Sequence, residues 1–205
     1  MKNKKAIKFL NTIIIFSLFT FSLSSICYAK KDDTNKLKAL IKKYNLRTAK
    51  LKDIPDDVTP LKINNVEDVD KYLMDFIETM NNTKPNMVDN ASLEITAETT
   101  GTRIHSSSGL TVMNICVNYS CKYDYVDMRN EYVRINSQSS WLSGLTLGLV
   151  WTQRGTRGGS CGELWYTYGV YGTIDAYLWV PIIGNTVLLY TYTYDSGTCT
   201  YYGAP

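Results

Sequence analysis

The stretch MNICVNYSCKYDY, residues 113–125, decides the fold class because its side chains alternate in character at every step. The odd positions carry apolar or aromatic residues and one cysteine, in the order Met113, Ile115, Val117, Tyr119, Cys121, Tyr123 and Tyr125. The even positions between them are mostly polar. A period of two is that of a β-strand, in which successive side chains point to opposite faces. The stretch therefore predicts a long strand with one buried face and one wetter face.

Further strand candidates lie on both sides of this stretch. They are residues 93–99, 131–136, 141–152, 164–171, 173–181, 186–194 and 198–202. Glycine-containing breaks at residues 154–159 and 195–197 separate some of them. Short strands that follow one another without helices predict a mainly β fold, an antiparallel β-sandwich, with a β-barrel as the alternative.

The chain before residue 91 has a helical period instead. Leu37, Leu40, Ile41 and Tyr44 recur at helical spacing, and Asn65 is a candidate cap for a second helix. The apolar stripe of that second helix comprises Val69, Tyr72, Leu73, Phe76, Ile77 and Met80. We expect this stripe to dock on the β part of the chain. The prolines of residues 54–60 interrupt the helical pattern between the two helices.

Composition places a boundary near residue 90. Residues 30–90 hold 12 Lys or Arg and 11 Asp or Glu, against 6 and 8 in residues 91–205. We therefore predict a charged, two-helix N-terminal segment at residues 30–90, with a linker at residues 81–90. A β domain follows at residues 91–205.

The first 29 residues predict an export signal. They contain four Lys and no acid, then an apolar run at residues 9–23, and they end in Cys27-Tyr28-Ala29. A lipoprotein signal with Cys27 lipidated is the alternative, although Ile26 stands where a small residue is preferred. No later apolar run approaches the ~20 residues of a spanning helix. The expected mature protein is secreted, or associated with the cell surface, and has no transmembrane segment.

Removal of the signal also changes the charge. The whole chain has 22 Lys and Arg, so 18 remain against 19 acids, a net charge of −1. The mature chain therefore lacks the excess positive charge that drives nucleic-acid binding by release of counterions. We expect no nucleic-acid partner.

Four cysteines remain in the mature chain: Cys116, Cys121, Cys161 and Cys199. An even number in an exported domain predicts two disulfides. In one continuous strand Cys116 and Cys121 point to opposite faces, which favours pairing of each with Cys161 or Cys199. A turn at residues 118–120 would permit a Cys116–Cys121 bridge instead. No pair has the CxxC spacing of a metal site, so no metal is expected.

Candidate reaction centres are few. His105 is the only histidine, and its serine-rich surroundings favour an exposed loop residue over a catalytic base. Glu163 and Asp175 form a conceivable but ordinary glycosidase pair. Asp124, Asp127, Asn130 and Glu131 depart from the EF-hand spacing for calcium, and we interpret them as a solvated hairpin turn. The sequence therefore assigns no catalytic residue and no cofactor.

The aromatic composition is the main functional indication. Residues 91–205 hold 13 of the 16 Tyr, all four Trp and no Phe, which suggests rings with one wet edge. The candidate ligand-binding residues are Trp165, Tyr171, Tyr177, Trp179, Tyr190, Tyr192 and Tyr194. Such rings suit stacking on sugars or protein contacts. A structural ladder of cross-strand aromatic pairs is the competing interpretation.

Two stretches resemble parts of known secreted proteins. IPDDVTPLKI, residues 54–63, and VEDVDKYL, residues 66–73, are similar to the N-terminal part of small exported proteins of Clostridium- or Bacillus-like Gram-positive bacteria. The stretch from GTIDAYL, residues 172–178, through Tyr190 resembles the closing strands of secreted β domains of unknown function from that group. The resemblance implies export and a β domain, and it transfers no site residue.

Three functions follow as hypotheses. The first is a non-catalytic binding module of the bacterial cell surface that recognises envelope glycan or an extracellular protein through the Tyr/Trp face. The second is a secreted antagonistic or toxin-like protein whose helical half is a pro-segment. The third is a hydrolase that uses His105 or the acids named above.

Overall fold

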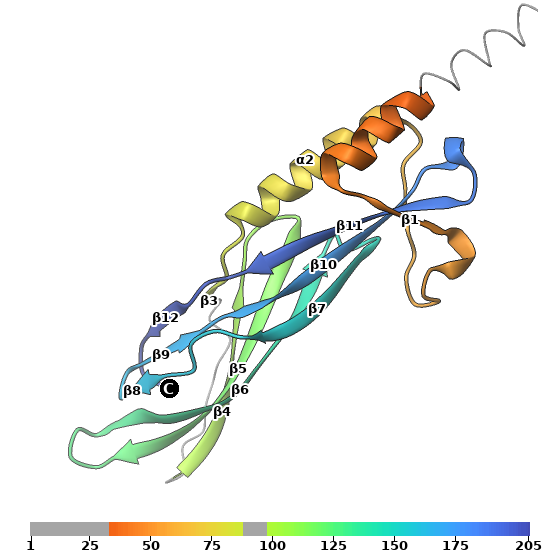
Figure 1. Cartoon of the computed structure of the whole chain (residues 1–205). Helices are drawn as coiled ribbons and strands as arrows, with labels where there is room; N and C mark the ends of the chain where they lie inside the picture. Colours follow the sequence, from red (N-terminus) through yellow and green to blue (C-terminus); the bar gives the residue numbers. More distant parts are fainter. Residues whose placement is uncertain (1–32, 88–97) are drawn as a thin grey trace, which may run out of the picture.

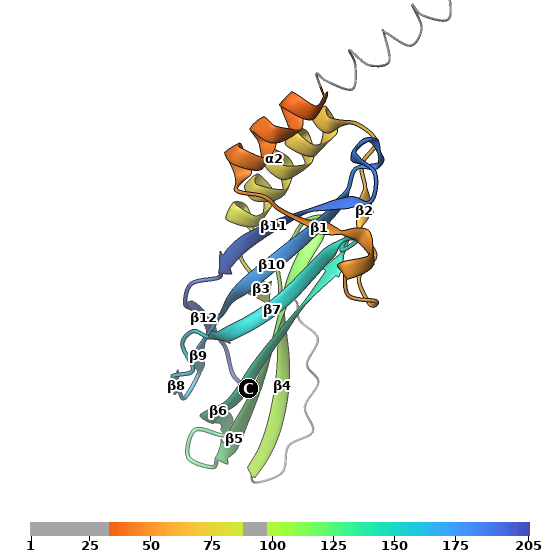
Figure 2. The same cartoon turned by 45° about the vertical axis from the view of Figure 1, so that its right-hand side comes forward.

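The computed structural model describes residues 33–87 and 98–205, and their fold is mainly β (Figures 1 and 2). The described strands form three sheets, none of which closes on itself. The predicted sandwich with a short helical N-terminal segment is therefore confirmed, and the barrel alternative does not describe these strands.

Two helices lie side by side on one face of the first sheet (Figures 1 and 2). One covers residues 33–44, and the other is α2, Val66–Asn82. The ion pairs Lys36–Glu67 and Lys43–Asp70 join them, at 2.9 and 2.7 Å. In the described part of the chain neither helix is long and apolar enough to cross a membrane.

The predicted stripe of α2 is its buried face. Val69, Leu73, Phe76 and Met80 are buried, as their spacing at three and four residues requires. Asn65 is the N-cap residue, but its side chain donates to the Asp68 carboxylate instead of accepting a backbone N–H. The helix continues through Asn82, so the first two residues of the predicted linker are helical.

The first sheet has the strand order β1-β11-β10-β2, and β7 pairs with β10 as well. Its strands are β1 Arg47–Lys50, β2 Leu61–Lys62, β7 Leu149–Thr156, β10 Val170–Trp179 and β11 Thr186–Asp195. β1 and β2 come from the N-terminal segment, on either side of the short 3-10 helix η1, Leu51–Asp53. The sequence did not predict these two strands, because two to four residues are too few to display a period.

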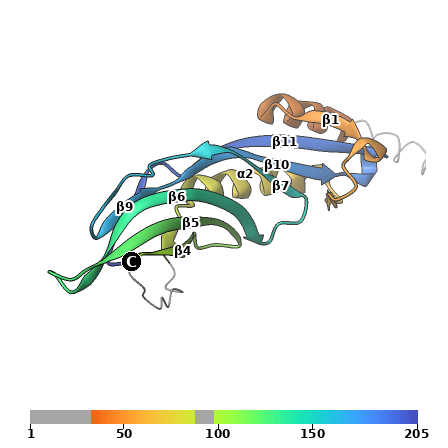
Figure 3. The ribbon, with the colours of Figure 1, turned by 90° about the horizontal axis from the view of Figure 1, so that it is seen from below.

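The second sheet has the order β3-β4-β5-β6, and β4, β5 and β6 run side by side as long curved strands (Figure 3). Its strands are β3 Asn86–Met87, β4 Glu98–Ser106, β5 Thr111–Asp124 and β6 Arg129–Gly144. The third sheet is small, with the order β12-β9-β8. Its strands are β8 Cys161–Gly162, β9 Trp165–Tyr168 and β12 Cys199–Tyr202, and the 3-10 helix η2, Pro181–Ile183, lies between β10 and β11.

Several predicted strand limits differ from the structure. The single strand expected at residues 141–152 is two strands with a turn at residues 145–148, because Gly144 and Gly148 take left-handed φ values of 80° and 72°. Gly169, with φ of 159°, divides the strand expected at residues 164–171. The break expected at residues 154–159 begins later, since β7 continues to Thr156. Of the strand expected at residues 93–99, residues 93–97 lie outside the described part.

The core consists of two clusters. The aliphatic cluster lies between the helices and the first sheet, and it contains Leu37, Leu40, Leu46, Ile63, Val66, Val69, Leu73, Leu178, Val180 and Leu188. The tyrosine cluster lies between the sheets, and it contains Phe76, Met80, Met113, Ile115, Val117, Tyr119, Cys121, Tyr132, Tyr166, Tyr168, Val170, Ile174 and Tyr194. α2 contributes to both, through Leu73 to the first and Phe76 to the second.

Candidate functional site

The seven aromatic residues expected to bind a ligand do not share one face. Tyr190, Tyr192 and Tyr194 lie on the helix side of β11. Tyr190 and Tyr192 meet the ring of Phe76 edge-on, at centroid distances of 6.2 and 5.8 Å. Tyr192 donates to Asn81 and Tyr194 to the carbonyl of Thr83, at 2.7 and 3.1 Å. These three rings dock α2 on the sheet.

Tyr171, Tyr177 and Trp179 lie on the opposite, outer face of the first sheet, where β10 alternates strictly. Trp179 donates its indole N–H to the carbonyl of Gly184, and Lys62 lies over its ring. Trp165 belongs to β9 of the third sheet. The predicted set is therefore divided among three surfaces.

Two of these aromatic residues cover glycines in the neighbouring strand. Tyr171 is opposite Gly155, and a Cβ on that glycine would lie 2.5 Å from the Tyr171 hydroxyl oxygen. Trp165 covers Gly162 in the same way, at 2.3 Å from its ring nitrogen. An aromatic ring over a cross-strand glycine stabilises a sheet that would otherwise lack side-chain contacts there. Tyr171 and Trp165 therefore have a structural role in their sheets.

Several tyrosine rings of this chain are buried and do not have one edge in solvent. Tyr119, Tyr166, Tyr168 and Tyr194 are buried, and burial raises the pKa of each phenol above its usual value. Tyr168 donates to the carbonyl of Pro85 at 3.0 Å. Tyr168 and Tyr194 thus satisfy backbone carbonyls that phenylalanine would leave unpaired. The expected wet edge is wrong for these four.

The four cysteines are free thiols in the structure. The burial of β5 places Cys121 on its inner face and Cys116 on its outer face, as the alternation predicts. Cys161 and Cys199 pack against the tyrosine cluster from β8 and β12, which are separated by β9. No two of the four lie at disulfide distance, so the structure does not support the predicted disulfides.

The prediction of an exposed His105 is wrong. It lies in β4 with no exposed surface, stacked on Tyr168 at 3.8 Å between ring centroids. Its Nε2 makes a hydrogen bond with the hydroxyl of Tyr166, at 2.5 Å. Burial, followed by the charge of Arg103, lowers the pKa of His105 to about 4. A histidine without solvent access in a close-packed core holds structure and does not serve as a catalytic base.

The acidic candidates have structural partners. Glu163 pairs with Arg129 and Asp175 with Arg47, in different sheets, so the structure does not bring them together as a glycosidase pair. Asp175 also accepts from Thr191.

The carboxylates considered as calcium ligands lie around the side chain of Arg129, which supplies the positive charge. Carboxylate oxygens of Asp124, Asp127 and Glu131 lie within 4.8 Å of one another. However, the guanidinium of Arg129 pairs with Asp127 and Glu131, at 2.9 and 3.4 Å. Asp124 accepts the backbone N–H of Val126, which lowers its pKa. This pattern is that of a hairpin turn.

The outer face of the second sheet carries a ladder of small polar side chains. Thr102 Oγ1 donates to Asn118 Oδ1 at 2.7 Å, and Asn118 Nδ2 donates to Ser137 at 2.9 Å. This rung crosses β4, β5 and β6. Ser120 and Asn136 form a second rung through hydrogen bonds of 3.0 and 3.2 Å. We call these two rungs the polar ladder.

A third, similar rung of hydrogen-bonded side chains lies farther along the same face. Ser106 donates to Asn114 at 2.7 Å, and Asn114 donates to Ser143 at 2.8 Å. Asn114 is buried, so this rung stabilises the sheet. In the register, Asn114 stands opposite Trp141, whose side chain therefore shares the outer face and is 42% exposed.

The ladder keeps capacity for an outside partner. Asn118 uses one of its two N–H donors and one oxygen lone pair within the rung, and the described residues leave one of each. Among the same residues, the hydroxyl proton of Ser137 has no acceptor, because the Ser137 oxygen accepts from Asn118. Between the row of Trp141 and the row of Asn118, the outward side chains are uncharged.

Hollows border this sheet at both ends, and each is lined by residues of both faces. One, of about 590 Å³, is lined by Thr99, Thr100, Ser120, Cys121, Val133 and Arg134. The other, of about 540 Å³, is lined by residues 57–59, 140–142 and 146–151, including Trp141 and Trp151. Four residues of strand separate the rows of Asn114 and Asn118, a distance of about 13 Å. A ligand that touches Trp141 and the ladder is therefore longer than a single sugar ring.

The even positions of residues 113–125 indicate this surface in the sequence, although their pattern alone predicts only a solvent-exposed face of the strand. The even positions 114, 118 and 120 are Asn, Asn and Ser, and Asn is a residue that strands usually lack. Which hydroxyls of β4 and β6 stand beside them depends on the register, with a bulge after Asn118. That register could not be derived from the period alone.

Comparisons with family models, with curated proteins and with solved structures give no match. The chemistry of the described surface is therefore the basis for a functional assignment. Between the rows of Trp141 and Asn118, that surface offers neutral hydrogen-bond donors and acceptors and one exposed indole. At the Ser120–Asn136 rung, Arg134 Nε donates to Asn136 Oδ1 at 2.9 Å.

Proposed function

We propose that the protein is a secreted, non-catalytic binding module that recognises neutral glycan of the bacterial cell envelope. The contact surface is the polar ladder with Trp141, instead of the Tyr/Trp set expected from the sequence. The observation that carries the proposal is the uncharged, cross-strand rung Thr102–Asn118–Ser137 on the same face as an exposed indole.

The chemistry of the surface supports a sugar chain. Amide and hydroxyl groups exchange hydrogen bonds with sugar hydroxyls, and an indole face covers the apolar C–H side of a sugar ring. Short side chains held by cross-strand bonds lose little conformational freedom on binding, which favours affinity. The lack of charge between Trp141 and the Thr102–Asn118–Ser137 rung disfavours a strongly ionic ligand there, and Arg134 places one cation at the second rung.

The test is retention of the secreted protein on purified Gram-positive cell walls. Trp141→Ala should reduce retention about tenfold, because a stacked ring is lost. Asn118→Asp keeps the size of the side chain but places a charge in the neutral rung, and it should weaken retention several-fold. Trp165→Ala is the matched control, since Trp165 is 37% exposed but lies on the third sheet.

Circular dichroism should show that all three variants are folded. Equal retention of the parent and of folded Trp141→Ala would remove Trp141 and its face from the proposal. Loss in Trp165→Ala alone would return the contact to the aromatic residues of the third sheet.

A further inference from the structure

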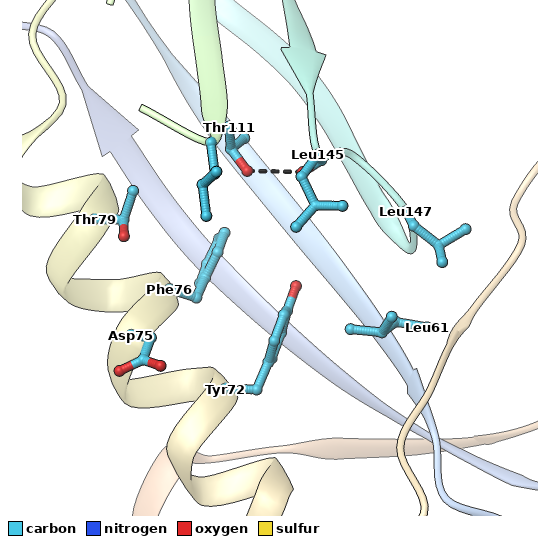
Figure 4. A pocket seen from close by; sticks show the side chains of 9 residues that line it. Leu61, Tyr72, Asp75, Phe76, Thr79, Thr111, Leu145 and Leu147 are labelled. Carbon is cyan, nitrogen blue, oxygen red and sulfur yellow. Dashed lines mark hydrogen bonds between the residues drawn. The ribbon is translucent and has the colours of Figure 1, made fainter. Parts of the chain in front are cut away.

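A separate, apolar hollow lies between α2 and two loops that end strands of the second sheet (Figure 4). Its volume is about 220 Å³. Tyr72 and Phe76 of α2 point into it from one side and Leu145 from the other (Figure 4). The remaining lining residues are Leu61, Asp75, Thr79, Leu110, Thr111 and Leu147. We call this hollow the leucine cleft.

Its rim exposes an unusual amount of apolar surface. Leu110, Leu145 and Leu147 are 77%, 60% and 48% exposed. Single exposed leucines are ordinary, but three around one cavity form an exposed apolar patch of the kind that marks a contact site.

The rim is held in place without a ligand. The N–H of Leu145 donates to the carbonyl of Leu110 at 2.7 Å. Thr111 Oγ1 donates to the carbonyl of Leu145 at 2.7 Å (Figure 4). These two bonds join the β4–β5 loop to the β6–β7 turn. A preformed rim reduces the entropy that binding must overcome.

The size of the cleft restricts what enters it. Cavities of about 150 Å³ hold a benzene molecule, whereas pockets for complete small-molecule ligands span about 300–1,000 Å³. The leucine cleft therefore fits one large apolar side chain, and it is too small for a whole metabolite.

The charge beside the cleft restricts the ligand further. Glu67 and Asp70 of α2 are paired with Lys36 and Lys43. Asp75 and Glu78, one helical turn farther along, make no ion pair within the described chain. Asp75 lines the cleft, and both acids line a second hollow on the other flank of α2, where Met74 is 55% exposed. An apolar cleft bordered by the unpaired carboxylate of Asp75, with Glu78 one turn along on the adjoining flank of α2, is complementary to an apolar group next to a cation.

We propose that the leucine cleft docks a cationic segment of a partner protein, which inserts one Leu or Phe side chain and sets Lys or Arg against Asp75 and Glu78. This surface is separate from the polar ladder, so the proposal does not depend on glycan binding. A partner bound there would be held beside whatever the ladder contacts.

Fluorescence anisotropy of a short labelled peptide tests the proposal. The probe alternates lysine with glycine and carries one central phenylalanine, and two further peptides replace phenylalanine with alanine or lysine with glutamine. The full secreted protein should bind the first peptide at least about tenfold more tightly than either of the others. Binding should weaken as salt is added, because the carboxylates are exposed to solvent.

Variants connect the binding to the cleft. Leu145→Ser with Leu147→Ser should reduce affinity about tenfold, and Asp75→Asn with Glu78→Gln should reduce it several-fold and flatten the salt dependence. Val126→Ser is the control, because Val126 is 89% exposed at the far end of the β5–β6 hairpin. The proposal is overturned if no peptide binds, if the leucine variant binds like the parent, or if the glutamine peptide binds as tightly as the lysine peptide. The last result would indicate a pocket for neutral apolar groups.

Discussion

The two core clusters fill space of different shape with different side chains. Between the helices and the first sheet, branched aliphatic residues such as Leu73 and Leu188 interdigitate. Between the sheets, long rings such as Tyr119 and Tyr166 extend across a gap that is typically about 10 Å wide. The helix side contains few polar groups to satisfy, whereas each buried phenol brings a hydroxyl into the core. One region of this small protein is therefore stabilised mainly by packing, and the other by packing plus hydrogen bonds such as those of Tyr168 and Tyr194.

Truncation in the aliphatic cluster should have the largest effect. Leu73 has no exposed surface, so Leu73→Ala removes buried methyl groups and leaves a cavity beneath α2. We expect the free energy of unfolding to fall by about 2–5 kcal/mol in urea denaturation. Met74→Ala, at the adjacent exposed position, should change it by less than about 0.5 kcal/mol. Similar losses in the two variants would show that α2 does not rest on the sheet through this stripe.

Acid should weaken the tyrosine cluster selectively. The pKa of His105 is about 4 in the folded chain and about 6.5 in an unfolded one. Because the folded state resists protonation, its stabilisation is complete above pH ~6.5 and is lost as the pH falls towards 4. The loss amounts to about 3 kcal/mol, most of it reached by about pH 5.

Urea denaturation at pH values between about 7 and 5 measures this loss, and His105→Gln is the control that should remove it. The carboxyl groups of Asp70 and Asp195 have lowered pKa values and titrate below this window, so they do not obscure it. If the free energy of unfolding of His105→Gln fell just as steeply with acid, a group other than His105 would take up the proton.

Hydroxyl removal should give the smallest effect and separate two kinds of tyrosine. Tyr194 donates to the carbonyl of Thr83, so Tyr194→Phe leaves that carbonyl without its partner and should cost about 1 kcal/mol. The hydroxyl of Tyr132 is buried and makes no hydrogen bond within the described residues. Tyr132→Phe should therefore be neutral or stabilising by up to about 1 kcal/mol. Thermal unfolding of both variants compares them, and a reversed order would mean that Tyr132 has the essential hydroxyl.

Much of the fold could be predicted from local patterns. The period of two in residues 113–125 gave β5 and its buried face, and the helical period gave the stripe of α2. The same patterns could not reveal β1 and β2, whose pairing with β11 and β10 depends on residues more than a hundred positions away. They also treated Tyr190 and Tyr177 as one set, although the strands place these rings on opposite faces of one sheet.

His105 shows the same limit at a single position. Its neighbours Ser106, Ser107 and Ser108 suggest a loop, yet β4 pairs with β5 over its full length and carries the ring into the core. Local sequence patterns were enough to predict the β class, the amphipathic helix and the alternation of faces, because these depend on residues a few positions apart. The folded chain was needed to find which polar residues form the ladder, which rings are buried and where the leucine cleft lies. Those features arise where distant strands and loops meet, and strand register and packing fix the meeting points.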